Sequence, residues 1–343
     1  MRTSTRRGTA ALAGILGAGL LAGGASTGGT LLAQRNTPAA TAAAPALDVV
    51  RLRPNFFVIA GAGGNIGVQT GPDGAIVVDA GTRASADAVI AEIKKLSDKP
   101  IRYVINTSAD PDHVGGNEKV AGAGQTILNL GNAALSGLTN GGAAAILAAE
   151  GVLTRMSAPT GQTSEWPSAA WPTETFAHRR SYMFLNGEGI ETLRQPAAHS
   201  DGDSVVFFRR TDVVMAGDVI DATRFPVIDV ARGGSIQGEI DALNRLVELA
   251  IPNFPLVWQE GGTYVLPGHG RPYEQIDVVE YRDMVTIIRD RVLALKKAGK
   301  SLAEVQAAQP AKGYTRQFGR DTGPWTTAMF VEAIYKTLPE SRQ

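Results

Sequence analysis

The sequence of 343 residues contains no cysteine and only four histidines. Without cysteine the chain cannot form disulfides, bind metal through thiolates or use a thiol as a nucleophile. Positive charge is not in excess either, because 33 lysines and arginines stand against 33 aspartates and glutamates. A chain with this balance lacks the basic surface that binds phosphate backbones. We therefore expect a small-molecule substrate and no nucleic acid partner.

The charge is unevenly distributed along the chain. All charged residues within positions 1–47 are arginines, and the remainder holds 29 basic and 33 acidic residues, a net charge of −4. Residues 1–33 have a basic start and a Gly/Ala/Leu-rich stretch, which predicts an export signal. Arg6 and Arg7 resemble a twin-arginine signal, although the large apolar residue that usually follows the pair is missing. A general secretory signal stays an alternative.

The apolar stretch is also long enough for a membrane anchor, but its glycine content favours a cleaved signal over a spanning helix. Residues 34–47, which are rich in alanine, threonine and proline, are predicted to be a flexible linker. These patterns predict a periplasmic or secreted protein with no stable membrane insertion after signal cleavage.

From residue 48 onward, short apolar runs and helical patterns occur in an order that repeats. The expected strands are 56–60, 65–70, 75–79, 101–105, 126–130, 181–185, 189–193, 204–209, 213–216 and 264–266. The expected helices are one after Ser85, 117–123, one that starts near 236, and 278–297, 302–308 and 326–338. Two halves of this kind, packed sheet to sheet with helices outside, make an α/β four-layer αββα sandwich over residues 48–275. Residues 276–343 are predicted to be a helical extension packed on this domain, and residues 132–180 to lie over or beside the site.

Acidic residues and histidines gather where the predicted strands end. A central loop after the strand 101–105 carries Asp110, Asp112 and His113. Three further residues hold the same kind of position beside glycine or serine, namely His199, Asp218 and His269. Imidazole and carboxylate ligands together suit zinc or another borderline divalent ion. His178 lies between an alanine and two arginines and is expected to be an ordinary surface residue.

The order of these residues resembles the metallo-β-lactamase fold superfamily of metallohydrolases. The resemblance covers about residues 50–272 and rests on Asp112 and His113 with Gly115, Gly116 and Asn117, then His199, Asp218 and His269. It implies a second metal position formed by Asp112, His113, Asp218 and His269. The family loop His-x-His-x-Asp-His is here Ser-x-Asp-x-Asp-His, so the first metal position is reduced to Asp110 and His199, with Ser108 as a weak donor.

Three outcomes stay open at this point. One ion binds at the second position, or two ions bind with Asp110 as an oxygen ligand and a harder ion such as Mn, Fe or Mg in the first position, or catalysis has been lost. The resemblance implies zinc as the cofactor, with manganese or iron as alternatives. Asp79 is a candidate to orient the central loop. The oligomeric state is left open.

The resemblance implies a metal-dependent hydrolase. A metal-bound hydroxide would cleave an ester, lactone, thioester or amide-like bond, with Asp112 or Asp110 orienting the water and carrying its proton. β-Lactams are less expected because the two leading histidines of the family loop are missing. The alternative from another class is an exported metal- or ligand-binding protein that has the same fold and no catalytic activity.

Overall fold

The computed structural model describes residues 46–127, 142–158, 161–253 and 261–339, and these residues belong to one compact unit. The export signal and nearly all of the linker predicted for positions 1–47 lie outside these residues. Within the described ranges, no helix is long and apolar enough to cross a membrane.

The first sheet has seven strands in sequence order, antiparallel from β1 to β4 and parallel from β4 to β7. They are β1 (Asp48–Arg53), β2 (Phe56–Ala62), β3 (Gly64–Gln69), β4 (Ala75–Val78), β5 (Ile101–Ile105), β6 (Ala145–Ala149) and β7 (Glu174–Phe176). The outer face of this sheet packs against α1 (Ala86–Leu96) and α3 (Asn117–Gly122) through a cluster that includes Val77, Val89 and Val120. Three short helices lie in its connections, α2 (Pro111–Val114), α4 (Glu150–Met156) and η1 (Ser168–Ala170).

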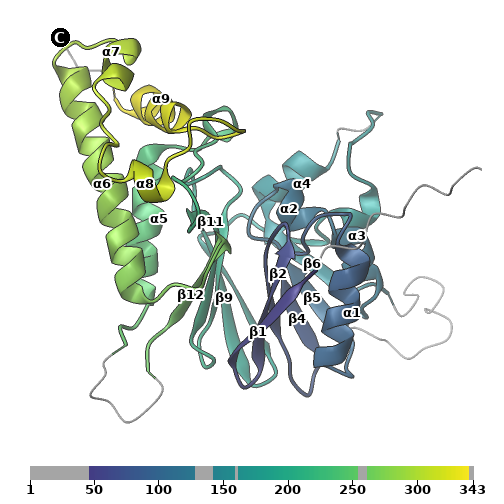
Figure 1. The fold of residues 1–343 in the computed structure, drawn as a ribbon. Coiled ribbons are helices and arrows are strands. Elements are labelled where there is room, and N and C mark those ends of the chain that lie inside the picture. Colours follow the sequence, from purple (N-terminus) through teal and green to yellow (C-terminus); the bar gives the residue numbers. More distant parts are fainter. Residues whose placement is uncertain (1–45, 128–141, 159–160, 254–260, 340–343) are drawn as a thin grey trace, which may run out of the picture. The chain divides into compact units, whose positions relative to one another are not determined.

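The second sheet has five strands in the order β12-β11-β10-β9-β8, and only the pair β11 and β12 is parallel. They are β8 (Arg180–Leu185), β9 (Glu188–Arg194), β10 (Ser204–Phe208), β11 (Val213–Asp221) and β12 (Tyr264–His269). The helical elements of this half are η2 (Val230–Arg232), α5 (Ile236–Leu249), α6 (Gln275–Lys297), α7 (Leu302–Ala307), α8 (Thr315–Phe318) and α9 (Thr327–Thr337). Figure 1 shows α5 and α6 on the outer side of this sheet.

The two sheets face each other across an apolar core. Side chains of the first sheet such as Ile76 and Ile105 meet Val206 and Met215 of the second, and the rings of Phe56 and Phe208 contact edge to face with centroids 5.0 Å apart. Every second residue of a strand points to the same face, so each strand contributes to this core and to an outer layer. The predicted four-layer αββα sandwich is therefore confirmed (Figure 1).

The C-terminal helices share a core with the second sheet. Tyr281, Met284 and Ile288 of α6 are buried in the same cluster as Val205 and Val214 of the sheet. The apolar stripe of α6 therefore packs inward, as its three-and-four spacing requires.

The strands of the structure differ from the predicted strands at several places. The strands β1, β6 and β7 were not predicted, because β1 alternates charged and apolar residues and β6 is mostly alanine, which has low strand propensity. The strand expected at 126–130 is wrong at 126 and 127, and its other three positions lie outside the described residues. The described part of 132–180 does pack beside the central loop, since Val152 and Met156 contact the cluster that contains Ala109 and Val114.

Candidate metal centre

Four chain segments bring acidic residues and histidines together at one edge of the sandwich, two of them after β5 and β9 and two within the C-terminal parts of β11 and β12. Their side-chain donor atoms form two groups, and within each group the atoms lie within 4.8 Å of one another. The first group is Asp112, His113 and His269, and the second is Asp110, His199 and Asp218. All six residues that the sequence predicted as metal ligands are therefore in one place. Their assignment as ligands stays a prediction.

Asp218 lies between the two groups. Its Oδ1 is 3.0 Å from Nε2 of His113 and 3.9 Å from Nε2 of His269, while its Oδ2 is 4.0 Å from Nε2 of His199. Ser108, the weak donor of the sequence argument, donates its hydroxyl to Oδ2 of Asp218 at 2.9 Å. Asp218 is thus placed to contribute one oxygen to each group.

The histidines are oriented by acceptors behind them. Nδ1 of His199 lies 2.9 Å from the carbonyl oxygen of Val227, and Nδ1 of His113 lies 2.8 Å from Oδ2 of Asp79. A carbonyl oxygen only accepts, so Nδ1 of His199 carries a proton, and Nε2, which faces Asp110 and Asp218, is the ring atom that would bind a metal. Histidines that bind metals are commonly held in this way.

Asp79 fixes the central loop, as the sequence argument proposed for it. The buried carboxylate accepts hydrogen bonds from the backbone N–H of Thr107 at 2.8 Å and from its hydroxyl at 2.7 Å, besides its contact with His113. The residue has a φ of 63°, a left-handed conformation that Asp and Asn tolerate better than most residues. Gly116 allows the same loop to pack closely, because a Cβ there would lie 2.2 Å from the carbonyl oxygen of Ala80.

Two further contacts at the site were missed from sequence. Nη1 of Arg232, which ends η2, lies 3.0 Å from Oδ1 of Asp110, whose Oδ2 lies 3.2 Å from Nε2 of His199. In the loop that follows His199, the buried carboxylate of Asp203 accepts from the backbone N–H and the hydroxyl of Ser200. The spacing of Ser200 and Asp203 is a turn signal that could have indicated this bond, whereas nothing in the sequence links Arg232 to Asp110.

The electrostatics of the cluster favour a cation. Burial alone would raise the pKa of Asp218, but the neighbouring histidines outweigh burial and hold that pKa far below its usual range. Burial alone would lower the pKa of His113, but Asp218 and Asp79 raise it well above its ordinary value. The pKa of His199 is likewise raised against burial, mainly by its hydrogen bond with Asp110. The raised histidine pKa values reflect the carboxylates that surround the rings, and a donor set of imidazole and carboxylate fits a divalent ion.

Glu239 of α5 is a buried carboxyl group whose oxygens have no hydrogen-bond partner among the described residues. Burial, and then the charge of Asp203, raise its pKa well above the ordinary 4.5. Ionisation of Glu239 therefore opposes folding, and this penalty is absent below pH 4.5 and grows as the pH rises towards the folded-state pKa.

We expect Glu239→Gln to increase the free energy of unfolding, and to do so more at pH 8 than at pH 5. The gain should grow by at least about 1 kcal/mol over this interval, the equivalent of roughly one pKa unit. Urea denaturation of both proteins at the two pH values measures it. A gain that does not change with pH would show that Glu239 does not ionise differently in the folded protein.

Comparison with known proteins agrees with the fold and with the central loop. Residues 60–132 match the family model of the Metallo-beta-lactamase superfamily, a segment that contains Asp110, Asp112 and His113. No curated protein matches the sequence significantly.

Solved structures give the same fold at low sequence identity. The stereoselective inverting sec-alkylsulfatase Pisa1 from Pseudomonas sp. is similar with a TM-score of 0.57 and 13% identity over 84% of this chain and 50% of that chain. A double mutant of the sec-alkyl sulfatase PisA1 gives 0.59 and 14% over the same shares. The DIM-1 metallo-beta-lactamase gives 0.50 and 13% over 71% of this chain and 98% of that chain. This chain thus spans about half the length of the alkylsulfatases, and at these identities the likeness shows the fold.

Proposed function

We propose that this chain, whose fold and family match are those of the metallo-β-lactamase superfamily, is a metal-dependent hydrolase of small molecules. Members of the superfamily are usually hydrolases that bind divalent metals. The observation that carries the proposal is the arrangement of six histidine and aspartate donors in two groups that meet at Asp218. A set of buried histidines oriented through Nδ1 supports a metal centre over an ordinary polar cluster.

The proposal assigns one tightly bound ion, zinc or else manganese or iron, to Asp112, His113, Asp218 and His269. Asp110 is the weaker donor because the guanidinium of Arg232 lies 3.0 Å from its Oδ1 and repels a cation there. When bound, the ion lowers the pKa of water towards neutrality and polarises the bond under attack.

Asp110 is the residue that we assign to proton transfer. Its side chain is 26% exposed, so it can reach a water molecule, whereas Asp218 is held by Ser108 and the histidines. His199 and Arg232 each contact one oxygen of Asp110 and so orient its carboxylate. Arg232 is itself half exposed and can bind an anionic part of a substrate at the rim of the site.

The substrate class that this arrangement suits is an ester, lactone, thioester or amide-like bond in a small molecule. Secondary alkyl sulfates belong in the same screen, because two structural neighbours are named as enzymes that act on them. The sequence of residues 1–33 supports export to the periplasm or the medium, without stable membrane insertion after signal cleavage.

Metal content tests the proposal directly. We expect about one ion per chain by elemental mass spectrometry on protein without a histidine tag, with loss of this ion in Asp112→Ala and retention in Asp110→Ala. Turnover of the screened substrates should be lost in both variants, since each lacks one of the two proposed roles. Loss of a second ion in Asp110→Ala would make Asp110 a ligand.

The rival function, a binding protein without catalysis, predicts different results. It requires that no substrate of the screen is turned over by the metal-loaded protein. Absence of tightly bound metal after supply of Zn, Mn and Fe would exclude the proposed hydrolase outright.

A further inference from the structure

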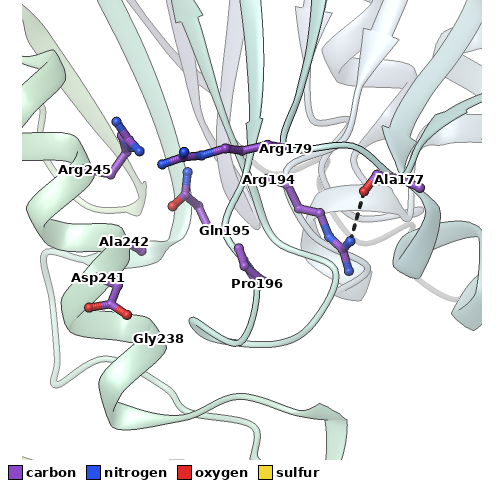
Figure 2. Close-up of a pocket in the computed structure, with 9 residues that line it drawn as sticks. All are labelled: Ala177, Arg179, Arg194, Gln195, Pro196, Gly238, Asp241, Ala242 and Arg245. Atoms are coloured by element: carbon purple, nitrogen blue, oxygen red, sulfur yellow. Dashed lines mark hydrogen bonds between the residues drawn. The ribbon is translucent and has the colours of Figure 1, made fainter.

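A cavity separate from the candidate metal ligands lies between the end of β9 and the outer helix α5. Its volume is about 500 Å³, and none of the six candidate metal ligands lines it. Arg179 and Arg245 project into it above the amide of Gln195, whereas the side chain of Arg194 points the other way, towards Ala177 (Figure 2). The lining thus holds three arginines and one acidic residue, Asp241.

Two of these arginines, Arg179 and Arg194, form no ion pair with an acidic residue of the described ranges. The guanidinium of Arg179 has neither a hydrogen bond nor an ion pair with any residue in the described part of the chain. Arg194 donates only to the backbone carbonyl oxygens of Ala177 and Asp201, at 3.2 and 3.4 Å, and its buried Nε has no partner in the same ranges.

The two remaining charges are engaged away from the arginine cluster. Arg245 pairs at 3.0 Å with Glu248, an exposed residue outside the cavity lining, and such pairs contribute little. The carboxylate of Asp241 accepts from Nε2 of Gln237 at 2.8 Å, and Figure 2 shows it one helical turn from Arg245. The guanidinium groups of Arg179 and Arg245 therefore face a concave space, and that of Arg179 has no acidic partner in the described ranges.

We propose that this cavity binds a small molecule through a phosphate or carboxylate group. Guanidinium groups offer paired N–H donors that match both kinds of oxyanion, and the side-chain amide of Gln195 lies directly below them. The volume is within the usual range for a ligand site. The phosphate and carboxylate alternatives share this recognition chemistry, and the experiment separates them.

The test is calorimetric titration of the full metal-loaded protein with inorganic phosphate and, separately, with citrate. We expect saturable binding of at least one anion, weakened at least about tenfold in the double variant Arg179→Gln with Arg245→Gln, because the charged bidentate contacts are lost. The matched control is Arg209→Gln, which removes the same charge from an arginine with a 63% exposed side chain that pairs with Glu191 outside the cavity. The affinity of this control variant for the anion should equal that of the unchanged protein.

Each outcome decides the proposal. Binding of phosphate alone or citrate alone identifies the preferred group. Absence of saturable binding for both anions overturns the proposal. So does binding that the double variant retains, which would assign the anion to the metal centre. If the double variant does not fold, the single change Arg179→Gln replaces it, since that guanidinium makes no contact that the described fold depends on.

Discussion

Replacement of Asp218 by asparagine is expected to remove most of the bound metal and to lower hydrolytic turnover by about a thousandfold, roughly 4 kcal/mol of activation free energy. The reason is its position. Asp218 belongs to the second donor group, and its carboxylate also lies within 4.0 Å of both histidines of the first group and of His199. An amide has nearly the same shape as the carboxylate but lacks its negative charge. A loss of metal and turnover in this variant would therefore result from the missing negative charge and metal ligand, and not from altered packing.

The measurement combines elemental mass spectrometry with initial rates on the substrate found in the screen. The control is Asp87→Asn, which removes a carboxylate from the exposed face of α1, where it pairs with Lys119. Both properties should be unchanged in that variant. Retention of the full metal content in Asp218→Asn would contradict the role of Asp218 as a ligand, and retention of full activity would contradict the proposed function of the site.

The parts of the site that could be predicted from sequence lie at the ends of the predicted strands. Asp110, Asp112 and His113 follow the apolar β-branched run of β5, and Asp218 follows the predicted strand 213–216, although β11 continues through it to Asp221. Where parallel strands lie side by side, their carboxyl ends meet at one edge of the sheet, so order along the chain gives proximity in space. The structure brings His269 to the same edge for this reason, since β12 runs parallel to β11.

The parts that could not be predicted depend on side chains that meet without a local signal. Arg232 reaches Asp110 across 122 positions of the chain, and Arg179 and Arg245 come together from a loop and a helix. Glu239 is an intermediate case. It lies three residues after Ile236 and four before Leu243, so helical spacing indicates a buried acid there. Only the structure shows that its oxygens have no partner in the described chain.

Replacement of Asp79 by alanine is expected to cost about 3–5 kcal/mol of unfolding free energy, the range for removal of one partner from a buried charged pair. The backbone N–H and hydroxyl of Thr107 and Nδ1 of His113 would all lose an acceptor. Alanine is also disfavoured at the φ of 63°. Asparagine adopts this conformation more readily than alanine and keeps one acceptor oxygen. Asp79→Asn should therefore lower the free energy of unfolding by less than Asp79→Ala does. Urea denaturation of the metal-free proteins measures both values.

The same pair of variants separates folding from metal binding at this residue. If Asp79 acts on the metal through the orientation of His113, Asp79→Asn should weaken metal affinity about tenfold to a hundredfold while the protein stays folded. Competition with a chelator measures that affinity. The matched control is Glu188→Gln, because Glu188 is also a buried carboxylate that accepts from a threonine N–H and hydroxyl, those of Thr211, but lies outside both donor groups. Equal metal affinity in Asp79→Asn and the unchanged protein would show that Asp79 contributes to stability alone. The negative charge that contacts Nδ1 of His113 would then have no effect on metal binding.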